Sequence, residues 1–233
     1  MRAFIRKMGA VHMLRNLPRF TFLAMTFLLA SWAWGQSGQD LVEIQSIDPT
    51  IQVELKYATA DNITGRVLYP ADFKAQLRRD IAVNLQKAQA VLRPLGYGLK
   101  VWDAYRPLEV QKALYAVISD PRYVAAPGVQ SMHNRGVAVD ITLVDAEGRE
   151  LEMPTKFDVM GRSASYFYSG GNPAVLKRVV LLQRVMSRAG FYACKTEWWH
   201  FFSRKWRDYP NVVETTVDAP PEQKNKSARK RVP

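Results

Sequence analysis

The chain has 233 residues, of which 48% are hydrophobic and 23% are charged, close to the average for globular proteins and unlike disordered or multi-span membrane proteins. One buried domain accounts for this length once the two ends are set aside. The formal net charge is +12, but residues 1–35 carry five bases and no acid, residues 218–233 carry a net +3, and about +4 remains over residues 36–217. So small an excess argues against a nucleic-acid partner.

Residues 1–35 have the pattern of a secretory signal peptide. Basic residues precede the apolar run from Phe20 to Ala30, and the small residues Ala33 and Gly35 fit cleavage before Gln36. The run is shorter than the about 20 residues that a membrane-spanning helix needs. We therefore expect an exported protein, periplasmic or secreted, with no stable membrane span after cleavage. The alternative is an uncleaved N-terminal anchor, which also places the domain outside the cytoplasm.

Residues 36–217 are predicted to form the catalytic domain, and their first half mixes strand and helix signals. Short extended apolar pieces indicate strands, and apolar residues three and four apart indicate helices. In chain order, the predicted elements are extended pieces within 41–55, a helix over 71–92, a strand over 99–102 and a helix over 107–118. Pro94 and Gly96 end the first helix, and Pro107 suits the first turn of the second because the first N–H groups of a helix have no intrahelical partner.

The second half has strand signals on both sides of one helix. In chain order, the predicted elements are a strand over 137–143, a hairpin turn over 145–148 into a strand over 150–153, a long loop over 157–171, a helix over 172–189 and a strand over 191–202. Because strands and helices do not alternate regularly, we expect an α+β domain with a mostly antiparallel central sheet flanked by helices. The polar, basic segment 218–233 is predicted to be disordered.

Two of the three histidines in the sequence, His133 and His200, follow the N-terminal segment. Asp140 comes seven residues after His133, within the strand predicted over 137–143. A catalytic zinc site takes three protein ligands and leaves a fourth position to water, and these residues supply that number without a thiolate. The sequence therefore predicts one zinc ion per chain, held by His133, Asp140 and His200.

Glu197 lies three residues before His200. On an ideal strand the two side chains would point to opposite faces, so an irregularity is predicted at Trp198-Trp199. A zinc-bound water has a pKa of about 7, and a carboxylate beside it can take its proton and pass it to the leaving amine. We predict that Glu197 is this general base. The alternative is a carboxylate that only orients His200.

These motifs resemble those of the D-alanyl-D-alanine dipeptidases, the VanX-like zinc peptidases related to zinc D,D-carboxypeptidases. The stretches that carry the resemblance, within about 41–210, are 57–65, 103–107, 131–140, 157–158, 190–191 and 197–201. The resemblance implies a D,D-peptidase/Hedgehog-like fold and a small dipeptide partner. It also implies hydrolysis of the peptide bond of D-alanyl-D-alanine in the breakdown or remodelling of cell-wall peptides.

The resemblance also implies roles for three further residues. Arg106 would stabilise the tetrahedral oxyanion together with zinc, Asp158 would meet the ammonium group of the substrate, and Ser131 would lie near its carboxylate. Alternatives are that Arg106 only pairs with Asp103 and that the Ser131 hydroxyl only stabilises a turn.

The sequence departs from the family in the segment after Asp158. The family commonly continues with an acidic stretch that ends in a Ser-His or Ala-His pair, and Val159–Ser165 contains neither. We expect this loop to border the substrate pocket, so it is where the dipeptide preference could differ. Cys194 has no spare histidine to activate it and is expected to be a buried, inert thiol.

Two other functions fit parts of the same pattern. One is a D,D- or L,D-carboxypeptidase that acts on longer peptidoglycan peptides. The other is a non-catalytic zinc-containing module that binds the cell wall, which the basic tail favours and which Glu197 and Arg106 oppose. The tail is also expected to contact anionic wall polymers or lipids weakly. Wall recycling, nutrient use and antibiotic resistance would all need the same chemistry.

Overall fold

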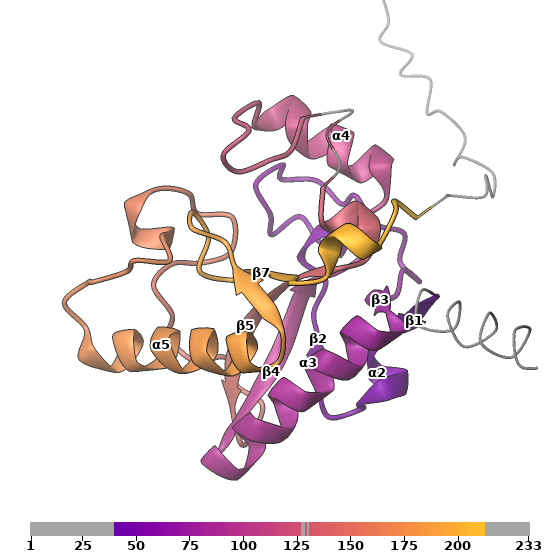
Figure 1. Cartoon of the computed structure of the whole chain (residues 1–233). Helices are drawn as coiled ribbons and strands as arrows, with labels where there is room; N and C mark the ends of the chain where they lie inside the picture. The colour runs from indigo at the N-terminus through magenta and orange to yellow at the C-terminus, as the bar shows by residue number, and fades with distance from the viewer. Residues whose placement is uncertain (1–39, 127–128, 130, 213–233) are drawn as a thin grey trace, which may run out of the picture. The chain divides into compact units, whose positions relative to one another are not determined.

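The computed structural model describes residues 40–126, 129 and 131–212 (Figure 1). The strands are β1 Leu41–Glu43, β2 Gln52–Val53, β3 Gln76–Arg78, β4 Tyr97–Asp103, β5 Ala138–Asp145, β6 Phe191–Ala193 and β7 His200–Ser203. The helices are α2 Ile44–Ile47, α3 Arg79–Leu92, α4 Leu108–Val117 and α5 Pro173–Arg188. Residues 1–35 and 218–233, predicted as signal peptide and tail, lie outside the described residues. Among the described helices, none is long and apolar enough to cross a membrane.

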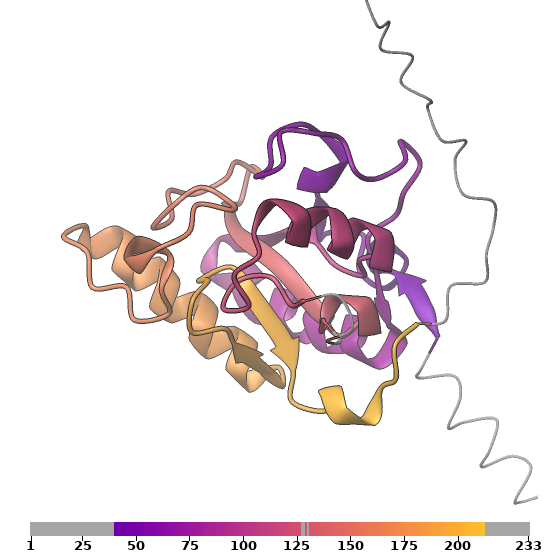
Figure 2. The same ribbon diagram turned by 90° about the horizontal axis from the view of Figure 1, so that it is seen from above.

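The main sheet has the strand order β2-β4-β5-β7-β6. The β2–β4 pair is parallel and the other pairs are antiparallel, and β1 and β3 form a separate antiparallel pair. Figures 1 and 2 show α3 and α5 along the sheet and α4 near the end of β4. The prediction of an α+β domain with a mostly antiparallel sheet is therefore confirmed.

The central strand β5 is buried along almost its whole length. Its apolar side chains pack into one core with the inner faces of α3 and α5. α3 contributes its apolar residues at helical spacing, among them Ile81, Leu85 and Leu92, each less than 1% exposed. A polar side chain on β5 is consequently held in a rigid, water-poor setting, and Asp140 is such a residue.

The helix predicted over 71–92 begins later than expected, at Arg79. Residues 76–78 form β3 instead and pair with β1 in register, with Leu77 opposite Val42. Leu77 is fully buried, so its apolar character fits a strand as well as a helix. The spacing of apolar residues could not show that a strand 35 residues earlier provides backbone partners for this segment.

The strand predicted over 191–202 is two strands, β6 and β7, joined by a turn. Cys194 N–H donates to the His200 carbonyl at 2.9 Å across this hairpin. The turn over 145–148 is confirmed by the hydrogen bond from Gly148 N–H to the Asp145 carbonyl, but the strand predicted after it is only a single bridge between Val144 and Glu150.

The termini of α5 and the start of α4 follow their sequence signals. The Asn172 side chain accepts hydrogen bonds from the first N–H groups of α5, and Gly190 follows the helix with a φ of +94°. Pro107 directly precedes α4. Residues 157–171 contain a short 3-10 turn at Arg162–Ala164 and are otherwise the predicted loop.

Candidate active site

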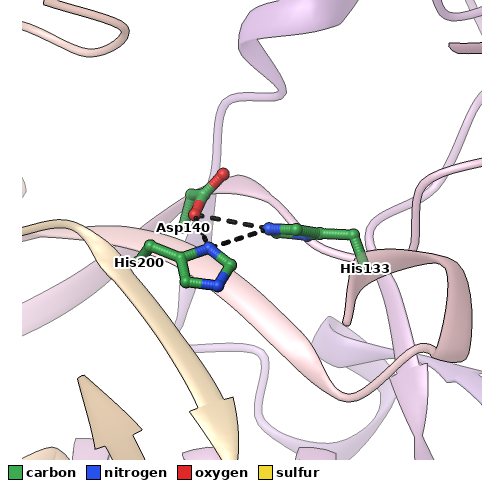
Figure 3. A group of neighbouring side chains, drawn as sticks. All are labelled: His133, Asp140 and His200. Carbon is green, nitrogen blue, oxygen red and sulfur yellow. Dashed lines mark hydrogen bonds and ion pairs between the residues drawn. The ribbon is translucent and has the colours of Figure 1, made fainter. Parts of the chain in front are cut away.

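Three predicted ligands, His133, Asp140 and His200, converge on one point (Figure 3). His133 Nε2 lies 3.0 Å from His200 Nδ1, and Asp140 Oδ1 lies 2.9 Å from His200 Nδ1 and 3.5 Å from His133 Nε2. Bonds of about 2.0–2.1 Å in a tetrahedral zinc site separate the ligand atoms by roughly 3.3 Å. The spacing and chemistry of the three donor atoms therefore fit zinc.

The register of the main sheet brings two of these ligands together. Asp140 on β5 is paired with His200 on β7 and, on its other side, with Asp103 on β4. His133 reaches the same point from a 3-10 turn over His133–Arg135. Gly136 follows with a φ of +69° and turns the chain into β5. The turn and strand at 133–140 and a strand 60 residues later thus present side chains at one level of the sheet.

The irregularity predicted at Trp198-Trp199 is present. Both residues form a turn immediately before β7, in which His200 N–H donates to the Glu197 carbonyl at 3.3 Å. Both indole rings are 1% exposed and pack edge to face with a centroid distance of 5.5 Å. The buried rings hold the turn in place, and the turn lets Glu197 and His200 face the same cavity.

The ligands are oriented by their neighbours in the protein. His133 Nδ1 lies 2.6 Å from the Ala104 carbonyl, so Nδ1 carries the proton and Nε2 faces the site. Burial alone would raise the pKa of Asp140, but the charges and hydrogen bonds of His133 and His200 hold it well below its usual range. Burial lowers the pKa of His200, whereas the hydrogen bond and charge of Asp140 raise it to about 9.

Glu197 lines the same cavity and is 8% exposed. Burial raises the pKa of its carboxyl to about 8. No hydrogen bond of this carboxylate is seen among the described residues, so it is not committed to orienting His200. A proton acceptor works best when its pKa lies near the working pH, and a zinc ion bound beside Glu197 would lower its pKa from this raised value.

Arg106 is buried beside Asp140, one of the three predicted metal ligands. Its Nε and Nη2 contact Asp103 Oδ2 at 2.8 and 2.7 Å, and Nη2 lies 3.6 Å from Asp140 Oδ2. Its guanidinium carbon lies 5.1 Å from the centre of the Tyr57 ring. The pair with Asp103, which the sequence offered as the alternative role of Arg106, is thus formed, and Arg106 also lines the cavity. Pairing and a place in the site are both observed.

Asp158 lines the same cavity in a strained backbone conformation. Its φ is +59°, which no other non-glycine residue in the described part adopts. Tyr57 Oη donates to one carboxylate oxygen at 3.2 Å and Ile63 N–H donates to the other at 3.1 Å. Burial raises the pKa of Asp158 to about 6, against the effect of the Ile63 hydrogen bond.

Ser131 also lines the cavity, and its hydroxyl accepts the His133 N–H at 3.2 Å. The turn role that the sequence left open for this hydroxyl is therefore observed. Cys194 is half-buried rather than buried as predicted, and its Sγ lies 3.2 Å from Thr196 Oγ1. Cys194 forms part of the cavity wall because it sits in the turn that leads to Glu197.

All seven predicted site residues border one cavity of about 200 Å³. Further polar residues border it that the sequence did not single out, among them Tyr57 and Gln111. Tyr57 is 101 residues away from its partner Asp158, and Gln111 lies on α4 beside Arg106. Only the resemblance over 57–65 pointed towards Tyr57, and no sequence signal pointed towards Gln111.

Comparison with known proteins identifies the family. The family model described as D-ala-D-ala dipeptidase matches residues 37–212. The chain belongs to this family. The D-alanyl-D-alanine dipeptidase of Escherichia coli (strain K12) is 37% identical over 175 residues, which are 75% of this chain and 90% of that protein. The D-alanyl-D-alanine dipeptidase of Enterococcus faecalis (strain ATCC 700802 / V583) is 30% identical over 177 residues, 65% of this chain and 85% of that protein.

A solved vancomycin-resistance D,D-dipeptidase in complex with a D-Ala-D-Ala phosphinate analogue is similar with a TM-score of 0.37 and 23% identity, over 70% of this chain and 66% of that chain. The D-Ala-D-Ala dipeptidase family consists of zinc metallopeptidases. Zinc is therefore the cofactor of this chain, and His133, Asp140 and His200 are the described residues that can hold it.

Proposed function

We propose that this chain hydrolyses the peptide bond of D-alanyl-D-alanine. The observation that carries the proposal is the arrangement of one cavity: three zinc-ligand atoms at 2.9–3.5 Å from one another lie beside an uncommitted buried carboxylate and a buried guanidinium. Family membership supports the substrate, because the curated relatives carry the name D-alanyl-D-alanine dipeptidase.

Zinc, when bound, supplies a Lewis acid that polarises the scissile carbonyl and acidifies water. Glu197 is placed to take the proton of the attacking water and to return it to the amine that leaves. Arg106 carries a permanent positive charge, since the charge of Asp103 outweighs burial and keeps its pKa well above the ordinary value. A fixed cation of this kind stabilises the oxyanion of the tetrahedral intermediate.

The walls of the cavity fit the two ends of a free dipeptide. Asp158 is the buried carboxylate that would pair with the ammonium group, with Tyr57 and Ile63 holding both of its oxygens. Ser131 lies on the cavity wall next to His133 and can meet the substrate carboxylate through its hydroxyl hydrogen, because its oxygen already accepts the His133 N–H.

The test is an assay of the zinc-loaded purified chain against D-Ala-D-Ala, N-acetyl-D-Ala-D-Ala and L-Ala-L-Ala. We expect turnover of D-Ala-D-Ala alone, because the acetyl group removes the ammonium that Asp158 pairs with. Faster turnover of the acetylated compound would identify a carboxypeptidase and contradict the proposal. Zinc binding without hydrolysis of any of the three would leave the wall-binding module as the better description.

We also propose that the enzyme is exported, that residues 1–35 are removed, and that residues 218–233 form a basic tail with weak affinity for anionic polymers or lipids. The support is the sequence of the two ends. N-terminal sequencing of the protein recovered outside the cytoplasm is expected to begin near Gln36. Recovery of the intact N-terminus from the cytoplasm would contradict export, and salt-independent adsorption to vesicles would contradict the role of the tail.

A further inference from the structure

Gln111 is a buried amide between Arg106 and the loop that precedes Ser131. It lies on α4, is 1% exposed and borders the active-site cavity. Its Oε1 accepts from Arg106 Nη1 at 2.9 Å, and its Nε2 donates to the Ala125 carbonyl at 2.9 Å. Because a guanidinium has donors only, the amide can have just one orientation here.

The hydrogen bonds of Arg106 give Gln111 a specific effect. A guanidinium has five N–H groups in one rigid plane. Asp103 takes those on Nε and Nη2, Asp140 lies near Nη2, and Gln111 takes one on Nη1. Among the described residues, this leaves the second N–H of Nη1 without a protein acceptor. Both hydrogens of Nη1 lie in the guanidinium plane, so the bond to Gln111, together with those to Asp103, fixes the orientation of that plane and with it the direction of the remaining N–H.

We infer that Gln111 is a positioning residue that aims the remaining N–H of Arg106 at the oxyanion of the substrate. The inference rests on the proposed function, since it assumes the oxyanion role of Arg106. Gln111 itself acts through Arg106. The second bond, to Ala125, prevents the amide from turning and joins α4 to the cavity wall at residues 121–125.

The first test observes the guanidinium in the zinc-free purified chain, without any turnover. With ¹⁵N-labelled arginine, the Nη protons of Arg106, assigned through their loss in Arg106→Lys, are expected to give separate NMR signals because hydrogen bonds slow rotation about the Cζ–N bonds. In Gln111→Leu the two Nη1 signals are expected to merge. Unchanged signals in Gln111→Leu would overturn the inference, whatever the substrate of the enzyme is.

The second test is kinetic. Gln111→Leu is expected to lower kcat about 10- to 100-fold, the worth of a hydrogen bond to a charged group, with KM changed about twofold or less, because the lost contact acts in the transition state. Gln111→Glu keeps an acceptor for Nη1 and is expected to recover part of kcat. If kcat falls and KM rises by similar factors in both Gln111→Leu and Gln111→Glu, the substitutions damage the cavity as a whole and the positioning role is contradicted.

The matched control is Gln89→Leu. Gln89 is also buried on a helix, with its Oε1 accepting from Leu99 N–H and its Nε2 donating to the Thr50 carbonyl, away from the active-site cavity. It should lose stability with no change in kcat. If Gln111→Leu does not fold, Gln111→Met preserves the length of the side chain and serves in its place. If the wild-type chain does not hydrolyse D-Ala-D-Ala but the Nη1 signals merge in Gln111→Leu, the proposed function is contradicted and the effect of Gln111 on Arg106 still stands.

Discussion

At the scale of single residues, a substitution can separate the two roles that the sequence left open for Glu197. A proton-shuttling carboxylate cannot be replaced by an amide, whereas a carboxylate that only orients a ligand often can. We expect Glu197→Gln to lower kcat by about 10²- to 10⁴-fold, the contribution of general acid–base catalysis, while zinc content stays at one ion per chain. Steady-state kinetics and metal analysis check this.

The control for this substitution is Glu109→Gln, because Glu109 is an exposed acid on α4 whose side chain is 75% exposed. It should leave kcat unchanged. If Glu197→Gln loses zinc and its kcat falls only modestly, Glu197 serves to orient the ligand His200 and is not the general base.

Two ionisations are expected on the acid limb of the pH profile, that of the general base Glu197 and that of Asp158. The Asp158 carboxylate must be ionised to pair with the substrate ammonium, and burial raises its pKa to about 6. A bound zinc ion nearby favours the carboxylate, so loss of the Asp158 charge should lower kcat/KM as the pH drops through a value at or somewhat below about 6. Asp158→Asn should raise KM above that pH, where the wild-type carboxylate is charged, and should remove this ionisation from the limb. A limb that persists unchanged in Asp158→Asn would contradict the assignment.

The same shift has a consequence for stability. The folded pKa of Asp158, about 6, lies above the unfolded value of 3.8, so the folded state disfavours the charged form and loses stability as the pH rises from 3.8 through about 6. Asp158→Asn removes a cost of about 1–3 kcal/mol at pH 8 and none at pH 3, where the carboxyl is protonated in both states. Denaturant unfolding of the zinc-free chain at the two pH values checks the sign.

The residues of the site differ in how far the sequence could predict them. Few histidines and one aspartate at a suitable spacing identified the ligands, because zinc chemistry restricts the residue types. Tyr57 could not be found from the residues alone, since its partner Asp158 is 101 residues away. Gln111 is five residues from Arg106, but nothing in the sequence marks it as the partner of that arginine. Polar residues that hold other polar residues have no spacing rule of their own.

At the scale of elements, Gly136 joins the turn that carries His133 to the strand that carries Asp140. Its φ is +69°, and an added Cβ would lie 2.6 Å from Leu41 Cδ2. Gly136→Ala is therefore expected to destabilise the fold by roughly 1–2 kcal/mol from the backbone alone, and to weaken zinc binding by shifting His133. Chemical denaturation and zinc titration measure the two effects.

Gly96→Ala is the matched control for Gly136→Ala. Gly96 has a φ of +78° with nothing within 4 Å of an added Cβ, and it follows α3 away from the site. It should show the backbone cost without any change in zinc affinity. Equal zinc affinity in both variants would mean that the turn does not position His133.

The elements also show where sequence patterns reach their limit. The ends of α5 were predictable because Asn172, Pro173 and Gly190 act on their own backbone neighbours. The start of α3 was not, because residues 76–78 are drawn into β3 by distant β1. Local caps are thus readable from sequence, whereas strand pairing depends on contacts that the pattern does not contain.

At the scale of the whole molecule, zinc should couple the three ligand-bearing segments into one folding unit. In the zinc-free chain, His200 shares a hydrogen bond with Asp140 that raises its pKa to about 9, against the effect of burial. Because the folded pKa exceeds the unfolded value of 6.5, this pair stabilises the zinc-free fold fully below about 6.5, and the contribution is lost as the pH rises through about 9.

Zinc binds the unprotonated imidazole, so below about pH 9 it must displace that proton, and its affinity should rise by up to about tenfold per pH unit. The proton that zinc displaces is the same one that stabilises the zinc-free fold, so the difference in Tm between zinc-loaded and chelator-treated protein should widen from pH 6.5 to pH 9. Thermal unfolding at constant free zinc measures it. A difference that stays constant or narrows over this range would contradict the coupling, and His200→Ala should lose both the zinc-induced rise in Tm and its dependence on pH.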